Sequence, residues 1–283
     1  MLKPTVVLGL FDGMSVGRLS FEQLGFKKIR YYSCEIDKYA NQVSHNNFPD
    51  IYRMGDILNW KNWDIIWSSI DYVIGGSPCQ GFSFAGLQLG LDDPRSVLFF
   101  TYIDILNHIR DVNPNVKFLL ENVKMKKEHL NVINDYMGVK PIFINSELVS
   151  AQTRRRWYWT NWDNVQPNKV DVLVPDILEI NPDIRNVTEK HKHHLLFGTD
   201  VPKKFSAIDP IKAITMTARQ YASWTGNFIS VGDSFRPFTP IECERLQTLP
   251  DNYTFGVSNA QRYKMLGNGW NLKTINHVIE QGS

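Results

Sequence analysis

The stretch TVVLGLFDGMSVG, residues 5–17, joins an apolar run to a turn that contains glycine. The run, residues 5–10, is short and rich in Val and Leu, which is typical of a buried strand. Gly13 allows a tight turn after it, where a ligand can approach the backbone closely. A strand that passes through such a turn into a helix predicts an α/β fold.

Further along the chain, strand-like and helical patterns alternate. Three more runs rich in Val, Ile, Leu and Tyr are bounded by turn residues, at 30–34, 72–74 and 117–120. Between the last two, one helical face carries Leu98, Tyr102, Ile105, Leu106 and Ile109. We therefore predict a mostly parallel sheet covered on both faces, in a domain of residues 1–162.

The pattern changes after Trp162. Residues 163–236 contain scattered prolines, glycines and polar runs without a clear helical period, which predicts a smaller irregular or β-rich module. We assign residues 163–257 to this small domain. Residues 258–283 are predicted to form C-terminal helices that pack back on the first domain.

The last part of the chain contains sequence signals for where helices begin and end. Residues 239–242 form a capping box with proline at the first helical position. Ser258 with Gln261 repeats this device, and Gly267 is expected to end the helix that follows. A final helix is predicted from the spacing of Leu272, Ile275 and Ile279.

The composition is that of a folded protein. Among the 283 residues, 43% are hydrophobic and 21% charged, and no apolar run is long enough to cross a membrane. The net charge of +2 is too small for a strong global field, so nucleic-acid binding would depend on local basic clusters. We expect a soluble intracellular protein, with a monomer favoured.

The chain has three cysteines, Cys34, Cys79 and Cys243. Their odd number and wide spacing argue against a disulfide framework and against a cysteine-rich zinc site, so we predict no metal. A lone cysteine in an intracellular enzyme can be a nucleophile, although a buried inert thiol is more common.

A possible nucleotide site follows the first two strands. The second strand ends in Cys34-Glu35-Ile36-Asp37, which places a carboxylate about 20 residues after the first turn, where it could bind ribose hydroxyls. Gly55-Asp56-Ile57 follows, with Asp56 at an expected strand end. The glycine spacing is not that of dinucleotide-binding enzymes. These residues indicate an adenosine-containing ligand only weakly, and ordinary turns and helix caps explain them equally well.

Residues that could perform chemistry follow later strands. Cys79 comes after an apolar strand, within residues 75–83. Pro78 directly precedes it, and glycines lie on both sides of it in the sequence. Ligands of open α/β sheets bind beyond the carboxyl ends of the strands, so Cys79 is placed for attack rather than packing. Glu121 follows another strand, where partial desolvation would favour a proton donor, although a surface glutamate is the alternative. Arg154 and Arg156 would share one side of an extended strand and suit a phosphate or carboxylate, unless they form an ordinary basic edge.

Three of these stretches occur in an order that resembles the cytosine-5 DNA methyltransferases. They are Ser77-Pro78-Cys79-Gln80, Glu121-Asn122-Val123 and Gln152-x-Arg154-x-Arg156. Phe11-Asp12-Gly13 resembles the cofactor motif of that family. The resemblance implies an α/β, Rossmann-like S-adenosylmethionine-dependent methyltransferase sheet with a small target-recognition domain.

The resemblance extends over nearly the whole chain outside residues 163–212. Residues 236–246 resemble the ninth block of the family and residues 261–270 the tenth. The chain looks like a compact bacterial or phage member, which implies a cytoplasmic enzyme of a bacterium or an infected host. Details that resemble the animal de novo branch lie at residues 149–152, 213–217 and Trp270.

The activity implied is transfer of a methyl group from S-adenosylmethionine to carbon 5 of a cytosine flipped out of duplex DNA. In the family chemistry, Cys79 would add to carbon 6 of the base. Glu121 would protonate ring nitrogen 3, and Arg156 would contact the base carbonyl. Arg154 would help to hold the active-site loop and a nearby phosphate.

The resemblance also implies contacts with the cofactor and the DNA. The expected cofactor residues are Phe11, Gly13, Glu35, Ile36, Asp56, Ile57, Pro78, Leu98, Asn268, Gly269 and Trp270. The expected DNA-binding residues are Gln80, Ser83, Gln152, Arg219 and Tyr221. The chain departs from the family in two places that bear on cofactor affinity. The front motif lacks a second glycine pair, and Gly269 stands where a serine is common.

Other contacts with the target remain open. The basic run of residues 190–194, with Lys203 and Lys204 behind it, is a candidate for phosphate contacts, for a less expected histidine metal site, or for a solvated loop. Gln220, Ser223 and Trp224 are further candidates for base contacts, and residues 82–95 for a loop that closes over the base.

Alternative functions use the same fold. A transfer-RNA cytosine-5 methyltransferase would share the chemistry and differ in the recognition region. A non-catalytic binding relative is less expected because Cys79 and Glu121 are both present. A nicotinamide-dependent oxidoreductase does not explain the proline-cysteine turn. The target sequence cannot be predicted from these residues.

Overall fold

The computed structural model describes residues 3–77, 96–198, 206–220 and 226–283. They form two compact units. The first comprises Met1–Ile144, Arg155–Gln166 and Ile275–Ser283, and the second comprises Asn145–Arg154 and Pro167–Thr274.

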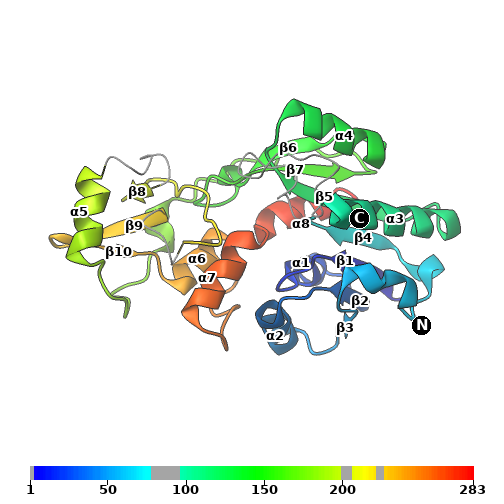
Figure 1. Cartoon of the computed structure of the whole chain (residues 1–283), viewed down its shortest axis with the longest axis horizontal. Coiled ribbons are helices and arrows are strands. Elements are labelled where there is room, and N and C mark those ends of the chain that lie inside the picture. Colours follow the sequence, from blue (N-terminus) through cyan, green and yellow to red (C-terminus); the bar gives the residue numbers. More distant parts are fainter. Residues whose placement is uncertain (1–2, 78–95, 199–205, 221–225) are drawn as a thin grey trace. The chain divides into compact units, whose positions relative to one another are not determined.

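The first unit is built on a mixed sheet with the order β3-β2-β1-β4-β5-β7-β6 (Figure 1). Strands β1 to β5 are parallel, and β7 runs antiparallel to β5. The strands are β1 Thr5–Leu10, β2 Ile29–Cys34, β3 Tyr52–Arg53, β4 Tyr72–Gly75, β5 Lys117–Val123, β6 Ile142–Asn145 and β7 Arg155–Thr160. The predicted α/β class and the four predicted strands are confirmed.

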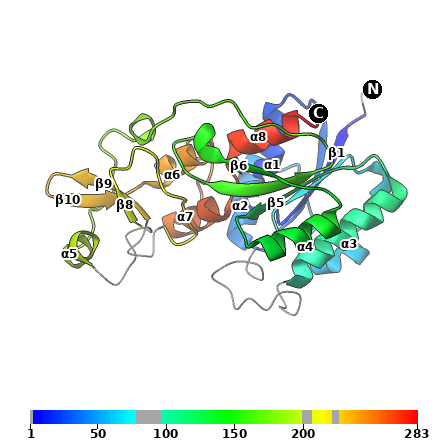
Figure 2. The same ribbon diagram turned by 90° about the horizontal axis from the view of Figure 1, so that it is seen from above.

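Helices cover both faces of this sheet (Figure 2). Helices α3 and α4 pack on the face that buries Leu8, Val73 and Leu120. On the other face, α1 packs through Phe21 against Tyr72, and the carbonyl of Gly282, just after α8, accepts bonds from β4 and β5. The elements are α1 Val16–Gln23, α2 Lys38–Asn47, the 3₁₀ helices η1 Ile57–Asn62 and η2 Trp67–Ser69, α3 Ser96–Val112, α4 Lys127–Met137 and α8 Leu272–Glu280.

Gly75, the last residue of β4, pairs with Leu10 of β1 and leaves no room for a side chain. A Cβ atom at this position would lie 2.7 Å from the Leu10 carbonyl oxygen and 3.2 Å from the Tyr102 ring. We predict that Gly75→Ala lowers the free energy of unfolding by about 1–3 kcal/mol, because neither the backbone of β1 nor the buried ring can yield without strain. Urea denaturation measures the change. Equal midpoints for Gly75→Ala and wild type would contradict this packing.

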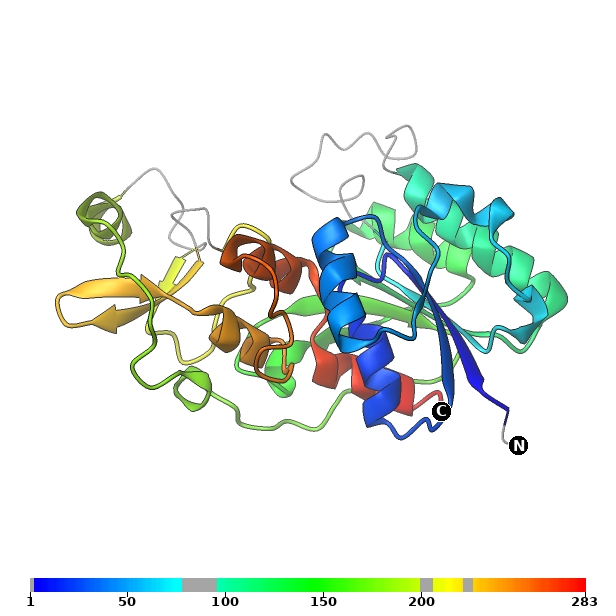
Figure 3. The same cartoon turned by 90° about the horizontal axis from the view of Figure 1, so that it is seen from below.

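The second unit contains a three-stranded sheet with the order β10-β9-β8. Strands β9 Gly226–Val231 and β10 Ser234–Pro237 pair antiparallel, and β8 Ser206–Ile208 runs parallel to β9. Figure 3 shows these strands with α5 Glu189–Phe197. The helices α6 Pro240–Leu246 and α7 Asn259–Asn268 and the 3₁₀ helices η5 Ser146–Leu148 and η6 Val174–Ile177 complete this unit.

The basic run of residues 190–194 is helical, not a loop. It lies in α5, where the Thr188 side chain accepts a bond from the backbone of His191, and the His191 ring meets Phe228 edge to face at 5.3 Å. No helical period is visible here because the apolar residues of α5 lie at one end of the helix rather than along one face. Within the described ranges, no group of three or more His, Cys, Asp or Glu residues could hold a metal ion.

Two of the predicted helix signals differ from the structure. The capping box of Thr239 and Glu242 is confirmed, but Ser258 makes no side-chain cap at the start of α7. Gly267 lies inside α7, and Gly269 is the C-cap. Gly267 serves close packing instead, because a Cβ there would lie 2.2 Å from the backbone of Thr217.

The division into units also differs from the predicted boundaries. Residues 258–274 belong to the second unit, where Arg262 of α7 bonds the buried Glu244 of α6 at 2.9 Å. Only residues 275–283 of the predicted C-terminal segment pack on the first unit. No helix among the described residues is both long and apolar enough to span a membrane.

Candidate active site

The order in which successive strands are added to the first sheet reverses direction between β1 and β4. From β1 the order runs through β2 and β3 on one side, and through β4 and β5 on the other. Open α/β sheets bind ligands beyond the carboxyl ends of their strands at this switch point. The residues that follow β1, β2, β4 and β5 are therefore the candidates for a site.

The turn after β1 has an unusual backbone. Phe11, Gly13 and Ser15 have φ angles of 54°, 57° and 61°, so residues with positive φ alternate with residues that have negative φ. This conformation costs free energy at Phe11, and such strain persists where the surrounding structure enforces it, often at ligand sites.

Asp12 holds this turn in place. Its carboxylate accepts bonds from the hydroxyls of Ser15 at 2.6 Å, Tyr31 at 2.5 Å and Ser33 at 2.7 Å. Burial raises the pKa of Asp12, and the three hydroxyl groups oppose that shift. The motif Phe11-Asp12-Gly13 alone predicts no role for this side chain. The signal available was Tyr31 and Ser33, two residues apart on one strand face.

Glu35 joins the turn after β2 to the turn after β1. Its Oε2 accepts a bond from the Gly13 N–H at 2.9 Å, and its Oε1 accepts bonds from the backbone of Ile36 and Asp37. A carboxylate has about four acceptor positions, so Glu35 can also accept a ligand hydroxyl. Ile36 is 75% exposed beside it and offers an apolar surface.

The other predicted cofactor residues of the first unit differ in exposure. Asp56 caps η1 by accepting a bond from the Leu58 N–H at 3.0 Å. Ile57 is buried in the core, and its contact with the cofactor stays a prediction. Leu98 is half-buried on α3 and packs against the same core.

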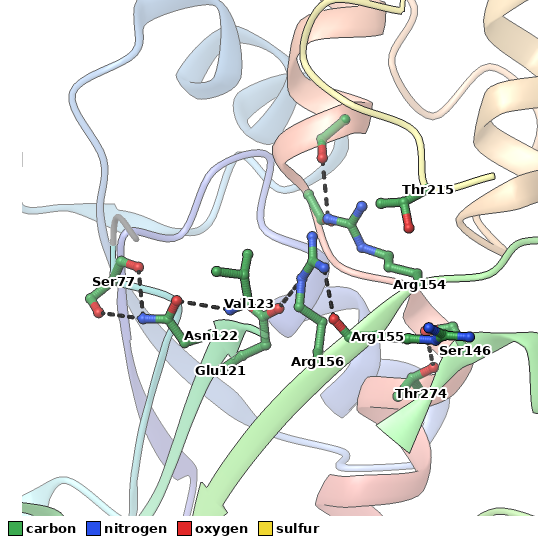
Figure 4. A network of polar contacts seen from close by, with 12 residues as sticks. Ser77, Glu121, Asn122, Val123, Ser146, Arg154, Arg155, Arg156, Thr215 and Thr274 are labelled. Atoms are coloured by element: carbon green, nitrogen blue, oxygen red, sulfur yellow. Dashed lines mark hydrogen bonds and ion pairs between the residues drawn. The ribbon is translucent and has the colours of Figure 1, made fainter. Parts of the chain in front are cut away.

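Four predicted site residues that come after β4 lie outside the described residues. They are Pro78, Cys79, Gln80 and Ser83, as is the predicted loop of residues 82–95. The chain is described up to Ser77, which is buried after β4. The Asn122 side chain donates to the hydroxyl of Ser77 at 3.3 Å and to its carbonyl at 3.4 Å. The residue before Pro78 is thereby tied to the neighbour of Glu121 (Figure 4).

Glu121 and Arg156 form an ion pair at the same edge of the sheet. Arg156 lies in β7 opposite Val123 of β5, and its Nε lies 2.8 Å from Oε1 of Glu121 (Figure 4). Their side chains are only 11% and 13% exposed. Removing two charges from water is costly, so a buried pair is weak evidence for stability. A charged pair at the ligand-binding edge of a sheet is instead a candidate for function.

Arg154 and Arg156 have different hydrogen-bond partners. Strand β7 begins at Arg155, and Arg154 is buried in the second unit. Its guanidinium donates to the carbonyls of Met216 at 3.3 Å, Gly267 at 3.1 Å and Gly269 at 2.7 Å. These bonds bury the cation against backbone, so the predicted contact with a phosphate is not supported.

Gln152 is also buried rather than placed for DNA. Its Oε1 accepts a bond from the Met216 N–H at 2.8 Å, and its amide donates to Leu246 and Gln247 at 3.4 Å. The sequence motif was found, but the sequence alone did not show which chain segment would cover it.

The remaining predicted residues of the second unit are mixed in exposure. Asn268 is exposed, and Gly269 and Trp270 are half-buried after α7. Arg219 is exposed, whereas Gln220 is buried and donates to the Asn227 carbonyl. Tyr221, Ser223 and Trp224, like Lys203 and Lys204, lie outside the described residues.

The two described free cysteines have unreactive surroundings. Burial raises the pKa of the Cys34 thiol, which contacts the Gly55 carbonyl at 3.0 Å. Burial also raises the pKa of Cys243, next to the charges of Glu242 and Glu244. Both thiols therefore stay protonated at pH 8, and a protonated thiol is a poor nucleophile.

We predict that iodoacetamide at pH 8 modifies native protein at Cys79 and spares Cys34 and Cys243. The reaction needs a thiolate, and raised pKa values keep the two buried thiols protonated. Peptide mass spectrometry measures the modification at each site, with urea-unfolded protein as the control for three reactive cysteines. Rapid labelling of Cys34 or Cys243 in native protein would contradict the prediction.

Comparison with known proteins gives consistent results. The family model described as C-5 cytosine-specific DNA methylase matches residues 6–204 and 199–283. The type II methyltransferase M.NlaX of Neisseria lactamica is 33% identical over 97% of this chain and 95% of its own length. M1.ScrFI of Lactococcus lactis subsp. cremoris is 31% identical over 97% of this chain and 77% of its own length.

Solved structures share the fold. The Entamoeba histolytica methyltransferase EhMeth has a TM-score of 0.78 at 17% identity and covers 99% of this chain and 98% of its own. The Dnmt2 methyltransferase of S. pombe has a TM-score of 0.72 at 17% identity, with 98% and 97% covered. The family model spans almost the whole chain, and the chain belongs to the C-5 cytosine-specific DNA methylase family.

Proposed function

We propose that this protein is a DNA (cytosine-5-)-methyltransferase that uses S-adenosylmethionine and acts on a cytosine flipped out of duplex DNA. The observation that carries the proposal is the buried ion pair of Glu121 and Arg156, next to the bond that ties Asn122 to Ser77. Ser77 precedes Pro78-Cys79 in the chain. The nucleophile expected for this reaction therefore follows β4 in the chain, and the expected acid lies at the carboxyl end of the neighbouring strand β5.

The residues of the first unit fit the cofactor. The strained turn of residues 11–15 presents backbone to a ligand, Glu35 can accept a hydroxyl, and exposed Ile36 can pack against a flat ring. When bound, S-adenosylmethionine supplies an electrophilic methyl group. We assign Phe11, Gly13, Glu35, Ile36 and Asp56 to its binding. Pro78, Leu98 and the turn Asn268–Trp270 are assigned by the family resemblance.

The chain's own residues would supply the remaining chemistry. The Cys79 thiolate forms a bond from sulfur to carbon 6, while Glu121, after it takes up a proton from solvent, gives that proton to ring nitrogen 3. Carbon 5 then becomes nucleophilic and accepts the methyl group. A solvent base takes the proton from carbon 5, ring nitrogen 3 returns its proton to Glu121, and the bond from sulfur to carbon 6 breaks, which regenerates the Cys79 thiolate. Arg156 holds the Glu121 carboxyl in place through its Nε.

DNA is the proposed partner. The base must leave the duplex to reach residues at the edge of a sheet. Exposed Arg219 is a candidate for base contacts, and Lys190 and His193 on α5 for phosphate contacts. Relatives such as M.NlaX of Neisseria lactamica are type II methyltransferases of bacteria, and this supports an enzyme of the bacterial cytoplasm.

Methyl transfer from tritiated S-adenosylmethionine tests the proposal. Unmethylated duplex DNA of varied sequence and transfer RNA are compared as substrates at equal cytosine concentration. We expect label in duplex DNA, recovered as 5-methylcytosine, and none above background in transfer RNA. Label in transfer RNA alone would replace the proposal with the RNA enzyme, and label in neither would overturn it.

A further inference from the structure

Residues 151–154 hold a segment far away in the sequence through hydrogen bonds. The backbone of Ala213 donates to Ala151 and accepts from Thr153, at 2.8 and 2.9 Å. The Thr215 hydroxyl donates to the Thr153 carbonyl at 2.6 Å, and the backbone of Met216 donates to Gln152. These bonds fix residues 213–216, which lead directly to Arg219.

Arg154 joins that segment to the end of α7. One arm of the guanidinium donates to Met216, and the other donates to Gly267 and Gly269. The carbonyls of Gly267 and Gly269 lie on either side of exposed Asn268. Arg154 is 3% exposed, so its cation interacts with these carbonyls in a largely water-free setting.

Gly267 allows the end of α7 to pack closely against residues 217–218. We call this contact, together with the Arg154 bonds, the junction. A Cβ atom at this position would lie 2.2 Å from the Thr217 carbonyl carbon and 2.3 Å from the Ala218 nitrogen. The end of α7 and residues 217–218 are therefore in direct backbone contact. They cannot shift independently while this contact and the Arg154 bonds are present.

We propose that Arg154 is a positioning residue that holds the turn Asn268–Trp270 and the segment before Arg219 in one fixed arrangement. The inference rests on the proposed function, in which the turn contacts the cofactor and the segment contacts DNA. Arg154 itself touches neither ligand and acts through the three carbonyls. Cofactor affinity and DNA affinity should therefore both depend on this one side chain.

Arg154→Lys tests the proposal with the charge retained. The ammonium group of lysine is compact and lacks the planar guanidinium, whose N–H groups donate to carbonyls in different directions. We expect the Kd for S-adenosylmethionine, measured by calorimetry without DNA, to rise about tenfold or more. The KM for duplex DNA should rise as well, while kcat at saturation of both substrates stays within about threefold of wild type.

Gly267→Ala is the second variant, because it disturbs the same junction and leaves Arg154 in place. It should raise both quantities in the same direction. Lys212→Met is the matched control. Lys212 also donates to three backbone carbonyls of this unit, those of Glu147, Ser150 and Val172, but to none at the junction. This variant should lower the Tm and leave both affinities unchanged.

Four outcomes decide between these possibilities. Weaker binding of both ligands by Arg154→Lys and Gly267→Ala, but not by Lys212→Met, supports the proposal. A lower Tm with unchanged affinities in Arg154→Lys would show a purely structural role. A lower kcat alone would show a role at the reacting base. Either result overturns the proposal. Wild-type protein that binds no S-adenosylmethionine overturns the proposed function itself, together with this inference.

Discussion

Replacing Cys79 with alanine should abolish methyl transfer to DNA, with a fall in kcat of at least about 10⁴-fold. Carbon 5 of cytosine is a weak nucleophile until a group adds to carbon 6, and alanine offers no group to add. Cys79→Ser should be similarly inactive, because a serine hydroxyl is a weak nucleophile at its ordinary pKa without an adjacent base. Initial rates with tritiated S-adenosylmethionine and duplex DNA measure the loss.

Cofactor binding is the control for this prediction. Both variants should bind S-adenosylmethionine with a Kd within about twofold of wild type, because removal of a group that acts only on the base leaves ground-state binding unchanged. Cys34→Ser is a second control, since that thiol is buried and protonated. Substantial methyl transfer by Cys79→Ala would show that another residue, or no residue, attacks carbon 6.

Glu121→Gln should lower kcat by about 10²- to 10⁴-fold, the range found when a general acid is removed. Glutamine has nearly the same shape and its carbonyl oxygen can still accept from Arg156 Nε, which now lies 2.8 Å from Glu121 Oε1. It cannot give a proton to ring nitrogen 3. The expected effect is therefore on the chemical step, which single-turnover kinetics measures directly.

Glu128→Gln is the matched control for the loss of one carboxylate. Glu128 is exposed in the first turn of α4, so its replacement should leave kcat unchanged. Glu121→Gln should also be compared with wild type in urea, because its partner Arg156 is nearly buried. A kcat within a few-fold of wild type for Glu121→Gln would remove Glu121 from the mechanism.

The sheet could be predicted because its signals are local. The run of residues 5–10 coincides with β1, and the apolar spacing from Leu98 to Ile109 lies within α3. A buried parallel strand needs a continuous apolar run, and such a run is visible in the sequence. The position of Glu121 at the carboxyl end of β5 follows from the same kind of evidence.

The surroundings of Gln152 and Arg154 could not be predicted in this way. Their partners are backbone groups of Met216, Leu246 and Gly269, which are far away in the sequence. Backbone groups carry no sequence signature, so a buried arginine bonded to carbonyls looks the same in the sequence as one exposed to phosphate. Alternation along an extended strand predicts one shared side for Arg154 and Arg156, whereas the structure shows that Arg154 precedes β7 and is buried against backbone carbonyls.

Gly267 and Asp12 illustrate two further limits. A glycine near the end of a helical pattern can end the helix or allow close packing, and only the position of Thr217 decides between these. Asp12 was noted as part of a motif, but its three hydroxyl partners come from both the turn and β2. The register of β1 and β2 brings them together, and register is a property of the pairing rather than of either strand.

Trapping of a covalent complex tests the central claim most directly. Duplex DNA that carries 5-fluorocytosine at the methylated position has fluorine in place of the hydrogen that must leave from carbon 5. We predict that wild-type protein and S-adenosylmethionine form a complex with this DNA that survives denaturing electrophoresis, and that mass spectrometry finds the linkage at Cys79. Wild-type protein that methylates ordinary DNA but forms no such complex, or forms it at another residue, would contradict the mechanism.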